Sequence, residues 1–161
     1  MNRLMARKPN YFSKSVYGGI FASSTTGVNA TAIVDTGIAI NQLAVEVGRK
    51  FEGVKLDLPV SFVADSGASI TYSLSLRDST ASGGTFVAFA TGNVTISNST
   101  TATGATVRGV ASISASLIGA KQWIRARCSR LGSAHDTGGD QLASSFDVIF
   151  FGADRNPATA S

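Results

Sequence analysis

Apolar and polar residues alternate with a period of two along most of the chain from about residue 31 onward. This period is typical of β-strands that bury one face. The clearest run spans residues 54–62 and places five apolar side chains on one side: Val54, Leu56, Leu58, Val60 and Phe62. Pro59 lies on the opposite side and has no backbone N–H, so we expect an edge position or an interrupted ladder there.

Residues 69–77 repeat the alternation and predict a second strand, whose inward side chains are Ile70, Tyr72, Leu74 and Leu76. The polar, Gly-containing residues 78–84 that follow are expected to form a loop. A turn at Thr91 and Gly92 is then predicted to join two short strands into a hairpin. The short strands are residues 85–90 and 93–97.

Three more strands are predicted further along the chain, at residues 106–117, 122–130 and 143–152. The inward residues of the first are small, which indicates close packing against an opposing sheet. Residues 146–151 are apolar on both sides of their strand. A strand of that kind is expected to be central in its sheet or covered by a partner.

The predicted elements favour an all-β protein. Helical spacing is arguable only at residues 41–47, which read equally well as a strand. About eight short strands joined by turns rich in Gly, Ser and Thr are typical of an antiparallel β-sandwich of jelly-roll or Greek-key style. We expect one such domain over residues 29–161. Residues 1–28 mix basic, aromatic and small residues without a period, and we expect them to form an extended arm.

The basic residues are concentrated in the expected arm. The chain has 14 Lys and Arg, 10 Asp and Glu, and a net charge of +4. Four basic residues near the N-terminus account for that excess, and the rest of the chain is balanced: Arg3, Arg7, Lys8 and Lys14. Such an arm can bind nucleic acid or dock on an acidic neighbouring subunit. Four widely spaced charges can neutralise only a few phosphates of a nucleic acid. We therefore favour an arm that docks on a neighbouring subunit, with Tyr11 and Phe12 as its apolar contacts.

The residues that could carry chemistry do not form a convincing active site. His135 is the only histidine, and Ser133 and Asp136 lie next to it in a polar loop. The members of a catalytic triad normally converge from separate elements, so we interpret this loop as a polar turn. The acidic residues that follow, up to Asp140, lack the ligand spacing of a calcium loop. We therefore expect no catalytic, cofactor-binding or metal-binding residues.

Cys128 is the only cysteine, which excludes a disulfide within the chain and favours folding in an intracellular compartment. It has no other metal ligands at a suitable spacing, so we expect a small core residue. The sequence shows no run of 18 apolar residues and no stretch typical of a signal peptide. We expect neither a membrane-spanning segment nor secretion.

A second basic group, in and beside the strand predicted at residues 122–130, consists of Arg125, Arg127 and Arg130, with Lys121 and Trp123 nearby. The period of two places Trp123, Arg125 and Arg127 on the outward side. Arginines beside an indole can stack on nucleic-acid bases. The same residue types are also enriched at protein interfaces. Because the chain beyond the arm is neutral, we favour a protein interface.

Short motifs in the second half of the chain resemble a group of virion structural proteins from tailed bacteriophages. The motifs are residues 119–127, 133–136 and 150–158, preceded in a similar order by residues 51–54 and 74–79. They are short and tied to no chemistry. The resemblance covers about residues 51–158.

This resemblance implies a capsid decoration (cement) protein, which binds the major capsid protein or other virion proteins and is often a trimer. The implied location is the virion, with the host cytoplasm during assembly. A tail or head-to-tail component is the nearest alternative. A nucleic-acid-binding β module that uses the basic arm, and a small hydrolase or carbohydrate-binding sandwich, are the alternatives from other classes.

Overall fold

The computed structural model describes residues 11–21, 33–34, 37–46, 51–102, 104–134 and 144–153. These residues form strands, turns and loops, and no helix among them could cross a membrane. The strands are β1 (Tyr11–Phe21), β2 (Ile33–Val34), β3 (Ile40–Asn41), β4 (Gly53–Ala64), β5 (Ser69–Ser79), β6 (Val87–Ser97), β7 (Ala105–Ser116), β8 (Trp123–Ala134) and β9 (Ser144–Ala153).

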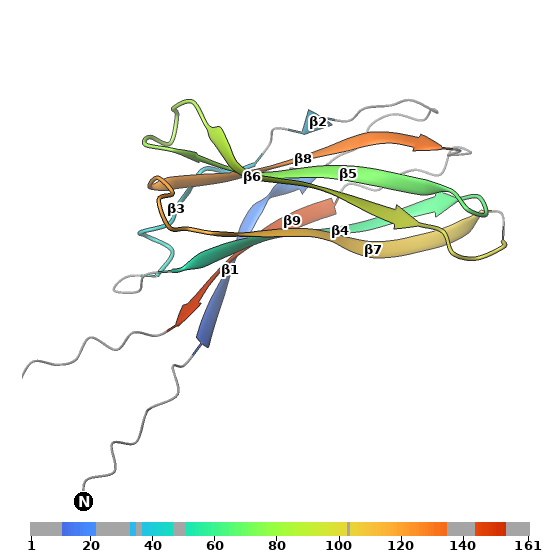
Figure 1. Cartoon of the computed structure of the whole chain (residues 1–161), viewed down its shortest axis with the longest axis horizontal. Helices are drawn as coiled ribbons and strands as arrows, with labels where there is room; N and C mark the ends of the chain where they lie inside the picture. Colours follow the sequence, from blue (N-terminus) through green and yellow to red (C-terminus); the bar gives the residue numbers. More distant parts are fainter. Residues whose placement is uncertain are drawn as a thin grey trace, which may run out of the picture.

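The strands form two layered sheets (Figure 1). One has the order β1-β9-β4-β7 and is called the β1 sheet below; the other has the order β2-β8-β5-β6 and is called the β8 sheet. The described strand pairs are antiparallel. β2 and β3 both pair with β8, at Ile33 opposite Ser129 and at Ile40 opposite Ile124, so together they act as one interrupted edge strand.

This strand order is a jelly roll. With β2 and β3 counted as one strand, the chain crosses from one sheet to the other at every connection except the hairpin between β5 and β6. The prediction of an antiparallel β-sandwich is therefore confirmed, and the jelly-roll alternative is the one that the chain adopts.

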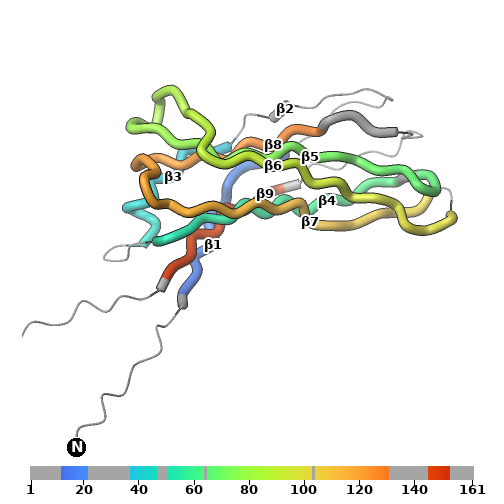
Figure 2. The backbone as a smooth tube through the Cα atoms, in the orientation of Figure 1, coloured from blue at the N-terminus to red at the C-terminus, as the bar shows by residue number. Residues whose placement is uncertain are grey.

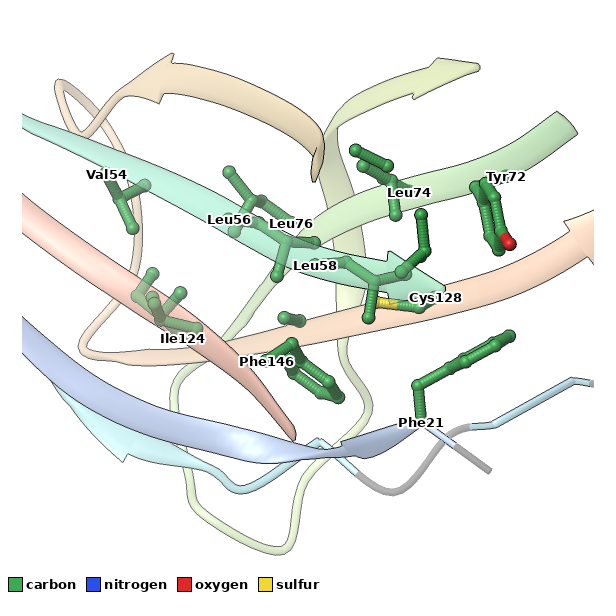
Figure 3. Close-up of a cluster of buried hydrophobic side chains, with 14 of the residues drawn as sticks. Phe21, Val54, Leu56, Leu58, Tyr72, Leu74, Leu76, Ile124, Cys128 and Phe146 are labelled. Carbon is green, nitrogen blue, oxygen red and sulfur yellow. The ribbon is translucent and has the colours of Figure 1, made fainter. Parts of the chain in front are cut away.

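The core fills the space between the sheets with side chains from both (Figure 3). The alternation predicted for residues 54–62 is confirmed, since Val54, Leu56 and Leu58 are fully buried. In β5 buried and half-buried residues alternate along the strand, with Leu74 and Leu76 fully buried. The ladder between β4 and β9 ends at Asp57 opposite Asp147, two residues before Pro59, as the missing N–H of Pro59 led us to expect.

The predicted hairpin at Thr91 and Gly92 is wrong, because β6 runs without a break from Val87 to Ser97 and both residues stay paired with β5. A Cβ atom at Gly92 would lie 2.8 Å from Cγ2 of Ile113 on β7. A Cβ at Gly109 would lie equally close, at 2.8 Å, to Cδ1 of Ile96 on β6. These glycines let β6 and β7 approach each other, and the predicted close packing of the small residues is confirmed.

The expected arm is wrong for residues 11–21. They form β1, an edge strand that pairs with β9 along its length; Figure 2 shows the two side by side in blue and red. Phe21 is fully buried, and the ring of Phe12 packs against Phe51 with centroids 5.2 Å apart. Residues 1–10 and 22–28 lie outside the described residues.

A register shift between Tyr17 and Gly19 explains why the alternation of apolar and polar residues does not predict a strand at residues 11–21. The bulge moves the inward positions from even-numbered residues such as Val16 to the odd-numbered Phe21, which hides the period of two. Gly19 adopts a φ of 147°, a conformation that favours glycine.

Residues 41–47 were expected to form either a short helix or a strand. Only Asn41 belongs to a strand, since β3 ends there and a turn follows.

Replacing Leu74 with Ala is expected to lower the free energy of unfolding by about 2–5 kcal/mol, because it leaves a cavity between the sheets. Its neighbour Ser73 faces outward, so Ser73→Ala should cost no more than about 0.5 kcal/mol. Denaturant titration of both variants measures the difference. Equal costs would contradict the described direction of these side chains.

Candidate functional site

The outer face of β8 carries the three residues that the sequence placed there. Ile124, Ala126 and Cys128 are fully buried on the inner side. Trp123, Arg125 and Arg127 therefore point away from the core, and all three are half-buried. The predicted direction of these three residues is confirmed. Arg130 does not join them, because it lies on the inner side of β8 opposite Tyr72 and is 1% exposed.

β5 adds a third guanidinium group to this surface. In the ladder between β5 and β8, Arg77 is directly opposite Arg125, and Ser75 is opposite Arg127. Opposite residues of an antiparallel pair share a face and have neighbouring Cβ atoms. We call the surface formed by Arg77, Trp123, Arg125 and Arg127 the arginine face. The alternation placed Arg77 outward, but its position beside Arg125 depends on strand register.

Packing holds Arg125 in place. Its guanidinium carbon lies 4.1 Å from the ring centroid of Phe86, a buried residue in the loop between β5 and β6. A cation over an aromatic face is attracted by the ring quadrupole. On another side, Gly37 leaves room for the stem of Arg125, since a Cβ atom at Gly37 would lie 3.0 Å from Cγ of Arg125.

The Nε atoms of Arg125 and Arg127 are buried and form no hydrogen bond within the part of the chain that the structure describes. The outward residues of β5, and those of β8 from Trp123 to Ser129, include no carboxylate; apart from the arginines and the tryptophan they are Ser or Thr. Like charges directly opposite one another are destabilising in a sheet. The arginine face therefore concentrates positive charge without an acidic residue among these positions.

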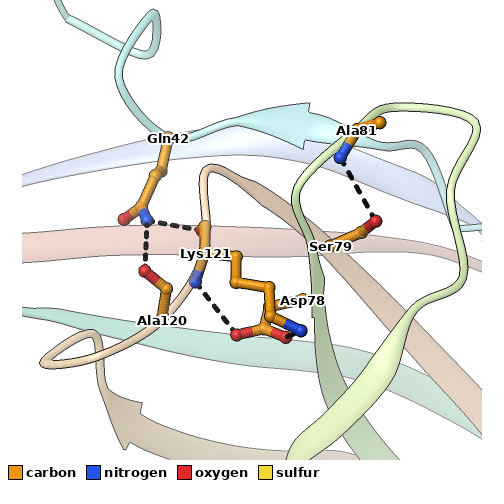
Figure 4. A network of polar contacts seen from close by, with 6 residues as sticks. All are labelled: Gln42, Asp78, Ser79, Ala81, Ala120 and Lys121. Atoms are coloured by element: carbon orange, nitrogen blue, oxygen red, sulfur yellow. Dashed lines mark hydrogen bonds and ion pairs between the residues drawn. The ribbon is translucent and has the colours of Figure 1, made fainter.

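A polar network at one end of the sandwich fixes the start of β8 (Figure 4). The Asp78 carboxylate accepts a hydrogen bond of 2.9 Å from the backbone N–H of Lys121 and lies 3.5 Å from its ammonium group. Gln42 donates to the carbonyl oxygens of Lys121 and Ala120, at 2.7 and 3.4 Å. These contacts anchor the loop that leads into Trp123 and Arg125.

The structure does not bring the other predicted interface residues to the arginine face. Tyr11, Phe12 and Lys14 lie on β1, in the other sheet. Phe12 packs within its own domain, whereas Lys14 is exposed. Four residues that the sequence singled out lie outside the described residues: Arg3, Arg7, Lys8 and His135.

The described residues offer no group of His, Cys, Asp and Glu side chains that could hold a metal ion. Burial raises the pKa of the Cys128 thiol from its ordinary value of 9.0 to about 12, because desolvation penalises the thiolate. A thiol with this pKa is a poor nucleophile at neutral pH. Cys128 therefore acts as a core residue, as its place on the inner side of β8 predicts.

No protein-family model and no curated protein matches the chain. No family is assigned. Solved structures of infectious bursal disease virus resemble it. The Gx strain structure has 15% identity, covers 94% of this chain and 33% of that chain, and has a TM-score of 0.45. The Gt strain structure has 14% identity, coverages of 97% and 37%, and a TM-score of 0.44. The VP2 subviral particle has 13% identity, coverages of 90% and 32%, and a TM-score of 0.39.

The chain thus spans about a third of the length of these viral proteins. A likeness at this level identifies neither a family nor a function. What the arginine face can do follows from its own chemistry: guanidinium groups present planar forks of donors that match carboxylates and phosphates.

Replacing Cys128 with Ala should lower the free energy of unfolding by about 1–2 kcal/mol at neutral pH. Between pH 9.0 and about 12 the unfolded thiol ionises while the folded thiol keeps its proton. The unfolded state then binds fewer protons, so stability falls as pH rises, by up to about 1.4 kcal/mol per pH unit from this group. Denaturant titrations across this range should show a shallower decline for Cys128→Ala, and parallel curves would contradict the prediction.

Proposed function

We propose that this protein is a non-enzymatic virion structural protein, a capsid decoration (cement) protein that binds capsid subunits through its arginine face. The observation that carries the proposal is the arginine face itself, where Arg125 and Arg127 are half-buried on one side of β8 and their buried Nε atoms form no hydrogen bond within the described chain. A surface of this kind gains most from a partner that supplies anions.

The jelly roll supports the proposal by analogy only, since this topology occurs in viral capsid proteins, in lectins and in cupins. Lectin and cupin functions need a sugar pocket or a metal site. The described residues provide no metal-binding group, and the arginine face lies on the outer side of one sheet. The sequence resemblance to phage virion proteins also favours an assembly role.

A protein partner is favoured over nucleic acid by the rest of the surface. The basic residues beyond the first 14 positions are balanced by acidic ones. The other outward residues of β5 and of β8 up to Ser129 are Ser and Thr, and the nearby Lys121 is paired with Asp78. Nucleic-acid affinity depends on the number of phosphates neutralised, and three guanidinium groups neutralise few of them. A capsid subunit with carboxylates on its surface would match this face better.

The double variant Arg125→Ala with Arg127→Ala is expected to bind empty capsid shells about tenfold or more weakly, as removal of anchoring interface residues commonly does. Arg125→Lys with Arg127→Lys keeps the charge but removes the forks, so it should be intermediate. Co-sedimentation with shells measures binding. The double variant Thr91→Ala with Asn93→Ala, on outward positions of β6 in the same sheet, is the control.

Two results would overturn this proposal. The first is unchanged shell binding by the folded double alanine variant. The second is tight binding of a single-stranded oligonucleotide with a steep salt dependence that the double variant flattens, by roughly 0.7 in the log-log slope for each phosphate that is no longer neutralised. A head-to-tail or tail component would instead bind portal or tail proteins and leave empty shells unbound.

The basic residues near the N-terminus are proposed as a second, weaker contact with the capsid. Replacing Arg3, Arg7 and Lys8 with Ala should weaken shell binding at low salt by a few fold, because exposed ion pairs each contribute about 0.2–1 kcal/mol. The difference from the unmodified protein should shrink as salt is raised. Identical binding at low salt would remove these residues from the interface.

A further inference from the structure

The outer face of the β1 sheet differs in kind from the arginine face. Four of the eight large apolar side chains that are exposed in the described chain lie on it: Tyr17 at 47%, Ile20 at 49%, Val110 at 55% and Phe151 at 38%. The outward positions of β5 and β8 carry none of these eight. We call the outer surface of β1, β9, β4 and β7 the mixed face, because it also carries charges of both signs.

Parts of the mixed face carry only low side chains. The ring of Phe151 lies over Gly53 on the neighbouring strand, where a Cβ atom would overlap the ring. Along the edge strand β7 the outward residues opposite Gly53, Lys55 and Asp57 are serines: Ser116, Ser114 and Ser112. Because the serine side chains are small and the ring of Phe151 lies against the sheet, a second protein surface can approach this part of the mixed face closely.

The charges of the mixed face are balanced. Lys55 and Asp57 form an ion pair of 2.9 Å, and Asp57 also accepts a hydrogen bond from Ser112. Asp147 is exposed and lies directly opposite Asp57, while Arg108 is exposed on β7. A second copy of the arginine face is a poor match for the first, because Arg125 and Arg127 would meet arginines and no carboxylate from the outward positions of β5 and β8. A second copy of the mixed face can pair opposite charges.

The strand register shows where such a pairing would be centred. Arg108 is opposite Ser61 on β4, and Asp147 is opposite Asp57 on the other side of β4. Pro59 lies midway between these two positions on β4, with the exposed Val110 opposite it. A two-fold axis in the plane of the interface at Pro59 can therefore place Arg108 of each copy against Asp147 of the other. Apolar side chains would lie at the centre of this contact.

The area of the mixed face approaches that of a stable interface. Four strands about 4.8 Å apart and about 11 residues long, at about 3.3 Å per residue, give at most roughly 700 Å², because β9 pairs with β4 only from Gly53 to Asp57. A standard interface buries about 800 Å² on each partner.

Pairing of β1 with the edge strand of a second copy is a poorer route to self-association. Lys14 lies opposite Phe150 on the inward side of β1 and is exposed there. An inward charge on an edge strand opposes pairing with another strand.

We infer that the mixed face binds a second copy of this chain about a two-fold axis at Pro59. The dimer leaves the arginine faces on opposite outer sides, free for other partners. This stoichiometry differs from the trimer that the sequence resemblance implies. The inference stands independently of the capsid proposal, because it concerns the other sheet.

Charge reversal with rescue tests the dimer. Arg108→Asp and Asp147→Arg should each weaken self-association by tenfold or more in sedimentation equilibrium, because each creates two like-charge contacts across the axis. The double variant Arg108→Asp with Asp147→Arg should restore it. Within one chain these residues are separated by β4, so rescue cannot come from pairing between them. Asn93→Asp, an exposed change in the other sheet, should leave self-association unchanged.

A monomer at all concentrations, a trimer, or single variants that associate like the unmodified protein would overturn the inference. Single variants that dissociate without rescue in the double variant would also overturn the proposed pairing. Folding of each variant is checked by its thermal transition. Shell binding of the arginine-face variants is measured separately, so either proposal can fail while the other holds.

Discussion

Every long strand buries one side between the two sheets, and this shared interior is the constraint on which the rest of the molecule depends. Neither sheet has a core of its own: Leu56 of the β1 sheet and Leu74 of the β8 sheet are both fully buried in one cluster. The jelly-roll connections enforce this, because nearly every step along the chain moves to the opposite sheet. The sheets must therefore form together, and their outer faces are then free to differ.

The outer faces differ because burial decides only half of the positions in each strand. On β8 the inner positions from Ile124 to Cys128 are apolar and the next one holds the buried Arg130, whereas the outer positions hold Arg125 and Arg127, which stay half-buried at the surface. Placing Arg77 opposite Arg125 works against the stability of an isolated sheet. The contact with Phe86 offsets part of that cost and limits the freedom of Arg125. The proposed partner would add negative charge beside Arg125 and Arg127, whose buried Nε atoms form no hydrogen bond within the described chain.

The inner and outer sides of β4, of β5 and of β8 up to Cys128 could be predicted from the sequence because these stretches keep a period of two, whereas Arg130 is buried at the next inner position of β8. β1 could not, since its bulge shifts the period and its glycines look like those of a flexible segment. Gly92 was misread for a related reason: glycine marks both turns and close approaches, and only the position of Ile113 distinguishes them. The position of Arg77 opposite Arg125 depends on the register between β5 and β8. These strands are distant in the sequence, and their register cannot be predicted from a single sequence.

The two outer faces divide the possible contacts of the molecule by their charge. A face with one sign of charge is self-repelling under two-fold symmetry, so it selects a foreign partner. A face with balanced charges and exposed apolar side chains can accept its own copy. Because the faces belong to different sheets, contact through one does not block the other. Under the two proposals, the protein would join a second copy of itself through the β1 sheet and a larger assembly through the β8 sheet, using only the outward half of its strand residues.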